Sequence, residues 1–376
     1  MKDKLHLVIP PGLSDGRYGT GIFLLAELQS LHQTGYHIHL HQFTTMDEFS
    51  GEELKNFCQE VSLYQPNTGH KAVSFKMPFA VASCYSAPLI EVLKNDNAPV
   101  VFYGTETASI LLCEGLWHKR AIIRNPYISP IKYLDNCRFS SGLHKKLYHL
   151  YEYLLCGRYE LELSKHFPVV PITCQDALMY NRKQNCEVHS IPMMVPEQQI
   201  SSIEGKGNYC LFFADFNEPE QQRSASWLLR HVFKDLKIPF VIAGNNPSDK
   251  LVRQAEHLGH VCVVTDPTPN ELQDLIAKSQ VVLMPVFSHT GIKAELYSAL
   301  QKGRHCLYFG PEPDCNIIQA CCHKARDLSE IRSLVAQLFD LHFSEEDIQI
   351  RNSSLNCMQT QSRTSKFVRL LQQQGN

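Results

Sequence analysis

Apolar positions along the chain alternate between the spacing of strands and the spacing of helices. Residues 5–10 (LHLVIP) form a short apolar run, and residues 22–33 (IFLLAELQSLHQ) carry apolar side chains at helical spacing. Gly35 follows, where glycine commonly ends a helix, and residues 36–43 (YHIHLHQF) then alternate like a strand. Further strand candidates are 79–84, 99–103 and 169–173. Strands and helices in this order predict a parallel, doubly wound sheet, which is an α/β fold.

The same alternation restarts in the second half of the chain. Residues 192–207 (PMMVPEQQISSIEGKG) lose the periodicity and gather the Pro, Gly, Ser and Gln of a linker. Beyond the linker, strands are expected at 209–214, 239–243, 260–264, 280–286 and 305–309, and helices at 222–236, 248–258, 270–278 and 292–302. We therefore predict two Rossmann-like domains, 1–192 and 208–350, that enclose a cleft between the carboxyl ends of their sheets. In residues 351–376, a helix at about 356–373 is expected to cross back onto the first domain.

Length and composition agree with two ordinary folded domains. The chain has 376 residues, more than one hydrophobic core usually supports, with 44% hydrophobic and 20% charged residues. A formal net charge of −2 argues against nucleic acid as a partner. No apolar stretch approaches the roughly 18–20 residues that span a bilayer, and the run at 5–10 is too short for a signal-peptide core. We expect a cytoplasmic protein, attached at most to the surface of a membrane.

The cysteines do not predict disulfides or a metal site. The 14 cysteines are scattered, mostly inside apolar segments, and no export signal accompanies them. They are interpreted as reduced, buried side chains. Cys315, Cys321, Cys322 and His323 lie close in the sequence, but adjacent cysteines fit no common zinc spacing. We therefore expect no metal there.

Two glycine-containing turns join a strand to a helix and are candidates for binding phosphate. The first ends in Gly19, Thr20 and Gly21 and leads into the helix at 22–33. The N-terminus of a helix offers unpaired N–H groups and a partial positive charge, and glycine lets a ligand approach the backbone closely. The alternative is a tight turn without a ligand. The spacing is not that of a dinucleotide-binding G-x-G-x-x-G loop.

The second turn follows the apolar strand at 280–286. Its residues His289, Thr290, Gly291, Ile292 and Lys293 bring backbone N–H groups, a hydroxyl and an ammonium group to one helix N-terminus. A diphosphate would find hydrogen-bond donors and positive charge together there. The alternative is that Lys293 is an ordinary solvated lysine. A cation in the first turn is unfavourable for the helix dipole, which favours the ligand role.

Two segments of the first half are candidates for the acceptor side. Tyr103, Thr105 and Glu106 follow a strand, so that the Glu106 carboxylate is expected in the cleft as a catalytic base or a ligand of an acceptor hydroxyl. The alternative is that Thr105 and Glu106 only cap a helix. The stretch 117–146 is basic and aromatic, and Arg120 lies within it. Such a surface suits an anionic acceptor or a membrane, and the alternative is a solvated loop.

Several common catalytic motifs do not occur in the sequence. The chain has no Asp-x-Asp pair of the kind that holds a divalent metal beside a nucleotide sugar. It also has no Walker loop and no His-Glu-x-x-His. Kinase and metalloprotease interpretations therefore have no specific support.

Several segments resemble the glycosyltransferases of family four, which have the GT-B fold. Residues 209–232 are similar to the opening strand, loop and helix of their nucleotide-binding domain, and residues 240–246 (FVIAGNN) to the next strand. Residues 289–303 (HTGIKAELYSALQKG) resemble the Gly-Ser-Gly-Ile-Lys … Glu-Ala-Leu-Ala-x-Gly segment of one subgroup. In the first half, 19–38 is similar to the glycine-rich donor loop with its helix, and 158–176 to the stretch before the linker.

This resemblance assigns the donor side to the second domain. It implies that Asp215, Asn217, Gly244, Asn245 and Ser298 contact the donor, together with the turn at 289–293. Lys293 takes a catalytic role by stabilising the leaving diphosphate, and Tyr103, Thr105 and Arg120 contact the acceptor. The resemblance implies retaining transfer without a metal ion, and the only small molecule expected besides the acceptor is the nucleotide-sugar donor. GDP-mannose, UDP-glucose and UDP-N-acetylglucosamine remain open as donors.

The sequence departs from the family pattern at several of these positions. Many relatives carry two glutamates eight positions apart, where this chain has Thr290 and Ser298. A hydroxyl grips a ribose diol less strongly than a carboxylate does. Asp215 and Asn217 replace the Arg and Lys that often clamp the diphosphate, and Gly104 with Thr105 replaces His-Asn in some relatives.

We therefore expect a glycosyltransferase that moves a hexose from a nucleoside-diphosphate sugar to a glycan or lipid-linked acceptor. Two alternatives stay open. The first is a binding or scaffold subunit of the same fold that has lost turnover. The second is a nucleotide-sugar 2-epimerase, which would need no acceptor.

Overall fold

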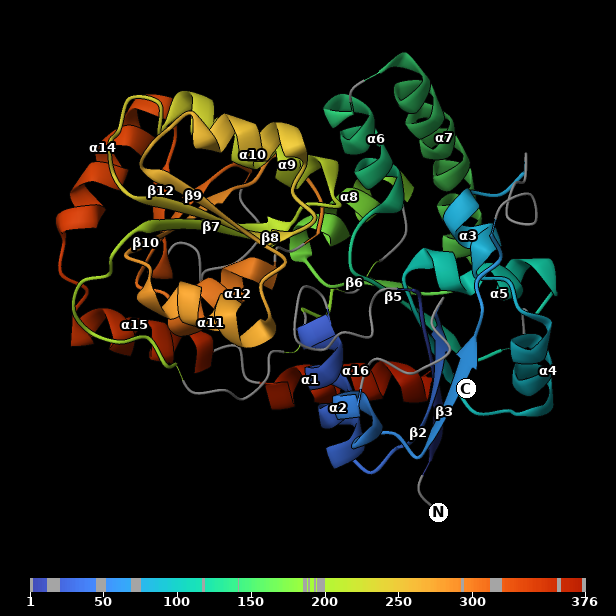
Figure 1. The fold of residues 1–376 in the computed structure, drawn as a ribbon. Helices are drawn as coiled ribbons and strands as arrows, with labels where there is room; N and C mark the ends of the chain where they lie inside the picture. The colour runs from blue at the N-terminus through green and yellow to red at the C-terminus, as the bar shows by residue number, and fades with distance from the viewer. Residues whose placement is uncertain are drawn as a thin grey trace.

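The computed structural model describes residues 3–11, 21–44, 52–68, 76–116, 119–140, 142–184, 188, 190–192, 194, 200–291, 294–311, 320–356 and 360–373. Within these ranges the chain forms two six-stranded sheets, each with helices against both of its faces (Figure 1). Every strand pair in both sheets is parallel. The predicted α/β fold of two doubly wound sheets is confirmed.

The first sheet has the strand order β3-β2-β1-β4-β5-β6. Its strands are β1 (Lys4–Ile9), β2 (His37–Phe43), β3 (Glu60–Tyr64), β4 (Val100–Tyr103), β5 (Ala121–Asn125) and β6 (Val169–Pro171). The chain changes direction across the sheet between β1 and β4, which is the switch point where α/β folds bind ligands.

Alternate side chains of β1 supply cores on the two faces of this sheet. Leu5 and Leu7 pack with α1 (Gly21–Gln33), whereas Val8 belongs to the core on the opposite face. The second face is covered by α3 (Phe79–Ser83), α4 (Ala87–Asn95), η2 (Thr105–Ala108) and α5 (Ser109–Cys113). A short helix, α2 (Glu52–Lys55), contacts α1. Burial of both faces explains why the central strands β1 and β4 are nearly continuous apolar runs.

The structure corrects two expectations in this half. Residues 79–84 do not form a strand, because Phe79–Ser83 is the helix α3, which begins directly after Pro78. Proline is well suited to the start of a helix, and this helix packs against η2. The strands β3 and β5 were not predicted. In β5 the sequence AIIRN contains Arg124, whose charge hid a fully buried strand.

Two helices stand beside the first sheet as an antiparallel pair, α6 (Ser129–Phe139) and α7 (Leu143–His166). They form the green projection at the top of Figure 1, and α7 is the longest helix of the described chain. Strand β6 and α8 (Cys174–Gln184) follow. The pair places α6 against the second domain, where it contacts α9.

The second sheet has the order β12-β11-β10-β7-β8-β9. Its strands are β7 (Cys210–Asp215), β8 (Phe240–Asn245), β9 (Val261–Thr265), β10 (Val281–Pro285), β11 (His305–Phe309) and β12 (His323–Ala325). Its helices are α9 (Pro219–His231), α10 (Asp249–Glu256), α11 (Pro269–Lys278), α12 (Ala294–Lys302) and α14 (Leu328–Asp340). Five of these strands match the predicted ones closely, and β12 was not predicted.

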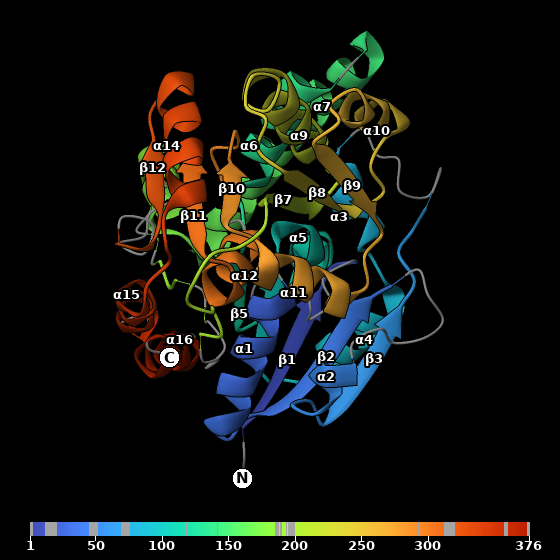
Figure 2. The same ribbon diagram turned by 60° about the vertical axis from the view of Figure 1, so that its left-hand side comes forward.

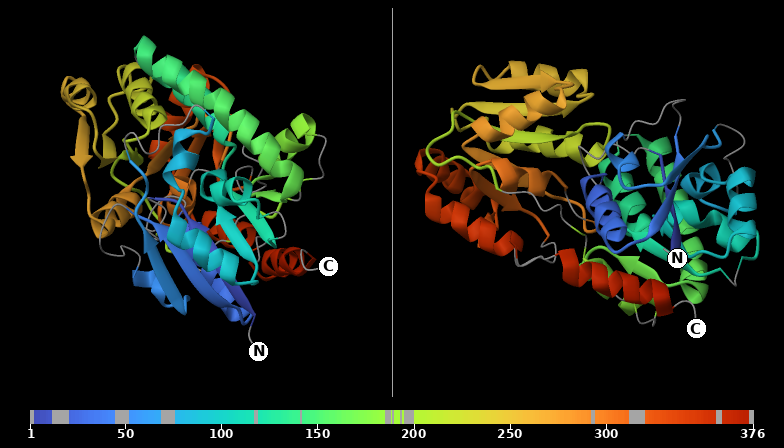
Figure 3. Two further views of the ribbon diagram at one scale, coloured as in Figure 1. Left: turned by 90° about the vertical axis from the view of Figure 1, so that its right-hand side faces the viewer. Right: turned by 90° about the horizontal axis from the view of Figure 1, so that it is seen from below.

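The last two helices return the chain to the first domain. α15 (Glu345–Asn356) lies beside the second sheet, and α16 (Thr360–Gln373) crosses beneath the first domain (Figure 3). Phe367, Leu370 and Leu371 of α16 join the core that α1 forms with the first sheet. Among the described helices, none combines the length and apolar character needed to cross a lipid bilayer.

Candidate active site

The carboxyl ends of the two sheets face each other, and four connecting segments meet between them. From the first domain come the β4–η2 junction and the β5–α6 turn, and from the second come the β7–α9 and β10–α12 loops. The starts of α1 and α12 lie side by side (Figure 2), and the rings of Phe23 and Tyr297 are 5.0 Å apart in an edge-to-face arrangement. The helices that follow both predicted phosphate turns are therefore brought together.

The β10–α12 loop presents its backbone N–H groups to carboxylates of this same chain. The amides of Phe287 and Ser288 donate to Oε1 of Glu220 on α9, at 3.0 and 2.9 Å. The hydroxyl of Ser288 and the amide of His289 donate to Oδ2 of Asp135 on α6, at 3.1 and 3.2 Å. The loop therefore presents its donors to carboxylates, and among these donors the His289 amide belongs to a residue predicted to bind phosphate.

Asp176 of α8 completes this contact between the domains. The Thr290 hydroxyl donates to its Oδ1 at 2.8 Å, and the Gly291 amide donates to its Oδ2 at 3.1 Å. The Thr290 oxygen also accepts the amide of Ile128 at 2.7 Å. Burial raises the pKa of Asp176, and its hydrogen bonds counter that effect. Asp135 and Asp176 were not among the predicted site residues.

Gly291 allows the two domains to approach this closely. Its φ angle is +74°, and a Cβ atom there would lie 3.2 Å from both the Pro126 carbonyl oxygen and the Tyr127 Cβ. A side chain at this position would be strained by its backbone conformation and crowded by the β5–α6 turn. Ile292 and Lys293, the next two predicted donor ligands, lie outside the described residues.

A cavity of about 380 Å³ lies between the domains beside this contact. Its walls include Thr105, Glu106, Tyr127 and Lys132 of the first domain and Asn217 and Glu218 of the second. A neighbouring cavity of about 210 Å³ reaches Thr290, Gly291 and the start of α12. Both domains therefore contribute polar side chains to a space large enough for part of a sugar nucleotide.

Glu106 is the carboxylate that the first domain offers to the larger cavity. It is nine-tenths buried in η2, and its Oε1 accepts the Tyr127 hydroxyl at 3.0 Å. Burial raises its pKa, and the hydrogen bonds it accepts together with Lys132 partly oppose the rise. Gly104 has a φ of +79°, and a Cβ there would collide with the Glu106 carboxylate. Glycine in place of the histidine of some relatives therefore leaves room for this carboxylate.

A second buried carboxyl group, that of Glu160 on α7, hydrogen-bonds to the segment that contains Glu106 and to the start of α6. Its Oε1 accepts the Thr105 hydroxyl at 3.2 Å and the Ser129 amide at 3.1 Å, and its Oε2 accepts the Tyr180 hydroxyl at 3.0 Å. Burial raises its pKa to about 7. Sequence reasoning missed Glu160, although it lies at helical spacing within the apolar face formed by Leu155, Cys156, Tyr159 and Leu163.

On the second domain, a polar chain follows the ends of β7, β8 and β9. Asp215 Oδ1 accepts the Asn217 side chain at 2.9 Å, and the Asn217 Oδ1 accepts that of Asn246, also at 2.9 Å. The backbone amide of Asn246 donates to Oδ1 of Asp266 at 2.9 Å. Asn217 lines the larger cavity, and Asn246 and Asp266 were missed. Their positive φ angles of 57° and 49° mark tight turns that asparagine and aspartate tolerate.

Gly244 and Asn245 end β8 within this group. A Cβ at Gly244 would overlap the Ala214 carbonyl of β7, so the glycine serves the close approach of two strands. The Asn245 carbonyl accepts the Phe216 amide at 3.0 Å, and the Asn245 side chain is exposed. Ser298 is half-buried in α12 and lines neither of the two cavities.

The structure separates some of the other predicted residues from the cleft. Tyr103 is buried in the core, where it hydrogen-bonds Glu27 and Arg124. Arg120 precedes β5 at the opposite edge of the sheet, and its guanidinium donates to the Asn97 carbonyl at 3.1 Å. Gly21 is the first residue of α1, and Gly19 and Thr20 lie outside the described residues.

The stretch 117–146 does not form one basic surface, which corrects the sequence interpretation. Lys119 is buried and donates to the Leu93 carbonyl at 2.8 Å, and Arg124 is fully buried and bonded to Glu27 at 3.1 Å. Lys132 pairs with Glu218 of the second domain at 3.3 Å. Among the described cations of the stretch, Arg138, Lys145 and Lys146 are exposed, the last two at the start of α7. Strand β5 lies within the stretch, and because it is a buried strand, Lys119 just before it and Arg124 within it are buried as well.

Comparison with known proteins places the fold. No protein-family model matches the sequence, and no curated protein matches it. Sucrose-phosphate synthase from Thermosynechococcus elongatus superimposes with a TM-score of 0.66 at 11% identity, over 99% of this chain and 98% of its own. A UDP-glucosyltransferase from Polygonum tinctorium capable of glucosylating indoxyl gives 0.56 at 12%, over 99% of both chains. The N-terminal domain of trehalose-6-phosphate phosphatase from Candida albicans superimposes with a TM-score of 0.60 at 10% identity, over 100% of this chain and 97% of its own.

These matches cover both domains and the cleft between them. The chain therefore has the GT-B fold, the two-domain architecture of the glycosyltransferases among these neighbours. Identities of 10–12% show the fold alone, and a fold by itself does not determine the activity.

Proposed function

We propose that this protein is a glycosyltransferase that moves a hexose from a nucleoside-diphosphate sugar to a glycan or lipid-linked acceptor. One observation carries the proposal. The cavity between the two sheets is lined by a buried carboxylate, Glu106, from one domain and by the polar end of β7, Asn217, from the other. A GT-B enzyme needs an acceptor group and a donor group to meet across such a cleft.

The donor diphosphate is assigned to the β10–α12 loop. Its amides at His289 and Gly291 already donate to the carboxylates of Asp135 and Asp176, so they are oriented to bind anions. A diphosphate would displace Asp135 and Asp176, and Lys293, which follows Gly291 by two positions in the sequence, would add positive charge. These donors neutralise the leaving group without a metal, in keeping with a sequence that has no Asp-x-Asp pair. Retention of configuration follows the resemblance to family-four enzymes.

Glu106 is assigned to the acceptor. Its raised pKa makes its carboxylate a stronger base than an exposed glutamate, which suits it to accept the proton of an attacking hydroxyl. Tyr127 donates to it from the β5–α6 turn, the same turn that contacts Gly291. Closure of the domains would therefore position the base and the donor loop together.

A lipid-linked acceptor fits the exposed face of α7. Leu143, Leu147, Leu150 and Leu154 follow helical spacing and are 43–74% exposed. The exposed charged side chains of the same turns are the cations Lys145, Lys146 and Arg158, because Glu152 and Glu160 are buried. An apolar stripe with basic neighbours binds the surface of an anionic membrane. We place the enzyme at the cytoplasmic face of such a membrane.

A second candidate function is a binding subunit without turnover. The specific observation is that Thr290 and Ser298 replace two glutamates while Asp176 and Asp135 fill the donor loop. Such a subunit would bind a nucleotide sugar and release no nucleotide. A 2-epimerase on this fold would form product without any acceptor.

One experiment separates these functions. The purified chain is screened for a rise in melting temperature over UDP, GDP and their sugars, with and without a chelator, because a ligand of the folded state stabilises it. The best donor is then incubated alone and with lipid-linked acceptors while released nucleotide is measured. Acceptor-dependent release supports the transferase, and binding without release supports the subunit. Stabilisation that a chelator abolishes would exclude metal-independent binding.

A further inference from the structure

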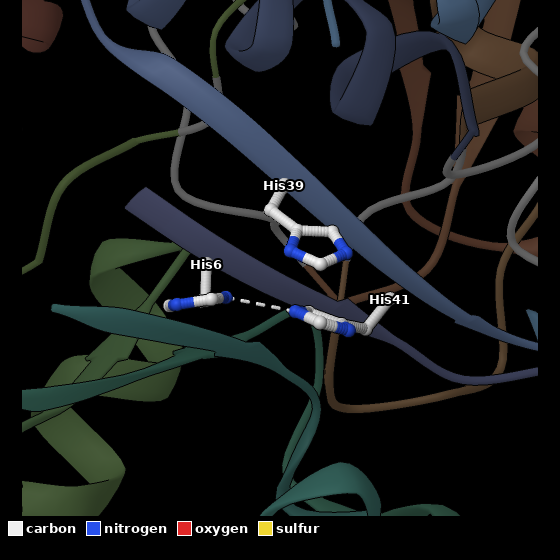
Figure 4. A group of neighbouring side chains, drawn as sticks. All are labelled: His6, His39 and His41. Carbon is white, nitrogen blue, oxygen red and sulfur yellow. Dashed lines mark hydrogen bonds between the residues drawn. The ribbon is translucent and has the colours of Figure 1, made fainter. Parts of the chain in front are cut away.

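Three histidines form a buried group on the first sheet, away from the cleft. His6 lies on β1, and His39 and His41 lie on the neighbouring β2, where parallel pairing sets His6 opposite His39 and Val8 opposite His41. Alternate residues of a strand share a face, so the three imidazoles point to the same side of the sheet (Figure 4). The exposed fractions of His6, His39 and His41 are 0%, 7% and 0%. A polar cluster buried this deeply needs defined partners.

We propose that His6, His39 and His41 form a binding site for a divalent transition-metal ion such as Zn²⁺. One ring nitrogen from each residue lies within 4.8 Å of the others, and Nδ1 of His6 is 2.9 Å from Nε2 of His41. Two imidazole nitrogens on a tetrahedral zinc ion lie about 3.4 Å apart, given zinc–nitrogen bonds of about 2.1 Å. Separation of the two rings by about 0.5 Å therefore admits the ion.

His39 supplies the third ligand from the side of the His41 ring that it packs against. Its ring lies over that of His41 with the centroids 4.0 Å apart, and its Nε2 is 2.8 Å from the Ser62 hydroxyl. Rotation of the side chain would exchange this hydroxyl for the ion, and Glu60, which contacts the other ring nitrogen from a side chain that is 61% exposed, would move with the ring. Three nitrogen ligands leave a fourth tetrahedral position for water.

The second nitrogen of each ring already has a polar partner. In metal sites, the ring nitrogen that does not bind the ion is usually hydrogen-bonded in this way. Nε2 of His6 is 3.1 Å from Asp96, and Nδ1 of His39 is 3.0 Å from Glu60. Nδ1 of His41 is 2.9 Å from the Tyr64 hydroxyl. Such partners fix the orientation of a ligating ring and increase its basicity.

The protonation state of the cluster suits a metal. Burial lowers the pKa of His6 to about 4, and it lowers the pKa values of His39 and His41 as well. Neutral imidazole is the form that binds metals, and imidazole ligands favour zinc, copper, nickel and iron over magnesium or calcium. The site lies on the strands and apart from Glu106 and the donor loop, so its role is structural and separate from sugar transfer.

The alternative occupant of this space is a metal-free hydrogen-bond chain. In that arrangement Tyr64 donates to His41, His41 donates to His6, and His6 donates to Asp96. Each ring then carries one proton and is satisfied without an ion. The hydrogen-bond chain binds no metal, whereas the metal site binds one ion and gives a visible absorption spectrum with Co²⁺.

The test is metal binding by the full chain. After removal of metals with a chelator, the protein is titrated with Zn²⁺ and, separately, with Co²⁺, whose visible absorption reports nitrogen ligands. We expect about one tightly bound ion per chain and a higher melting temperature with zinc. His41→Gln and His39→Gln should each weaken binding at least tenfold.

His37→Gln is the matched control, because His37 is exposed at the start of the same strand. His305→Gln tests a second buried histidine, which lies 3.3 Å from His323. Both controls should bind like the unaltered protein. Absence of a stoichiometric ion in the unaltered protein would overturn the proposal whether or not the variants fold. Equal binding by His39→Gln and His37→Gln would overturn it as well.

Discussion

The Thr290 hydroxyl of the second domain donates a hydrogen bond of 2.8 Å to the Asp176 carboxylate of the first. The adjacent Gly291 amide donates to the other oxygen of the same carboxylate at 3.1 Å. A carboxylate and a phosphate compete for the same amide donors. The described conformation is therefore a closed contact between the domains. A donor diphosphate that binds this loop as proposed would have to displace Asp176, a residue of the first domain.

Removal of this competitor should increase the affinity for nucleotide. In Asp176→Ala, a charged hydrogen-bond acceptor leaves the loop, which corresponds to about 1.5–3 kcal/mol, or roughly a tenfold or greater gain in affinity for UDP or GDP. The melting temperature should fall, because the domains lose a buried contact. Calorimetric titration measures the first effect and thermal unfolding the second. Asp274→Ala, at an exposed position of α11, is the control, and weaker nucleotide binding by Asp176→Ala would contradict the closed-contact interpretation.

Lys293 remains the cation predicted to bind the diphosphate. A charge-assisted contact of this kind contributes about 1.5–3 kcal/mol, which is roughly ten- to a hundredfold in affinity. Lys293→Ala should therefore weaken donor binding or turnover by that factor while the melting temperature of the free protein stays nearly unchanged. Lys278→Ala changes an exposed lysine of α11 and should leave both quantities unaltered. Donor binding by Lys293→Ala at the level of the parent would place the phosphate site elsewhere.

The fold was predictable because its central strands, such as β1 and β10, are buried on both faces. Runs such as LHLVIP and QVVLMPV predict central parallel strands, and β1 and β10 lie at these runs. The strand β5 was missed because Arg124 interrupts its apolar run. That arginine is fully buried only because Glu27 of α1 and carbonyl groups near residue 191 surround its guanidinium. Such partners come from distant segments that a local pattern does not reveal.

The candidate site was predictable to a similar extent. Glu106 and Asn217 lie at the ends of predicted strands, so the rule that α/β folds bind ligands at carboxyl edges placed them in the cavity. Asp135, Asp176 and Glu160 were missed because they lie on helices, where a carboxylate is usually a solvated side chain. The burial of Asp135 and Asp176 arises from the contact between α6, α8 and the β10–α12 loop, and Glu160 of α7 is buried against Thr105, Ser129 and Tyr180; both are tertiary relationships.

Gly104 should be essential for the acceptor side of the site. Gly104→Ala brings a Cβ atom into the Glu106 carboxylate at a φ of +79°, so we expect a lower melting temperature and a large loss of turnover. Glu106→Gln keeps the shape of the side chain and should lose turnover without the loss of stability. Gly259→Ala is the control, because a Cβ there meets no atom within 4 Å. Parental turnover in both Gly104→Ala and Glu106→Gln would exclude Glu106 as the base.

Glu160 should make the folded state less stable as pH rises. Its pKa is about 7 in the folded protein and about 4.5 in the unfolded chain, so between these values the folded state binds the additional proton. The free energy of unfolding therefore decreases with increasing pH across this window, by up to about 1.4 kcal/mol per pH unit. Glu160→Gln cannot titrate and should flatten the profile between pH 5 and pH 7. Denaturant unfolding at several pH values measures the slope, with exposed Glu256→Gln as the control.

The start of α7 should bind anionic membranes. Its exposed leucines at 143, 147, 150 and 154 lie beside Lys145 and Lys146, and the exposed charges of these turns are positive. Lys145→Glu combined with Lys146→Glu reverses that charge, and each cation near an anionic surface contributes about 1 kcal/mol. We therefore expect at least a tenfold loss of binding to vesicles of phosphatidylcholine with phosphatidylserine, measured by co-sedimentation at low salt.

Lys234→Glu combined with Lys237→Glu makes the same change in charge on the second domain, at exposed positions beyond α9. This control should bind vesicles like the parent if α7 makes the contact. Leu147→Ser combined with Leu154→Ser removes apolar area but keeps every charge, so its residual binding should be more sensitive to salt than that of the parent. Equal losses in the two lysine double variants would show attraction by overall charge, and unchanged binding in the Lys145 and Lys146 variant would exclude this end of α7 from the membrane contact.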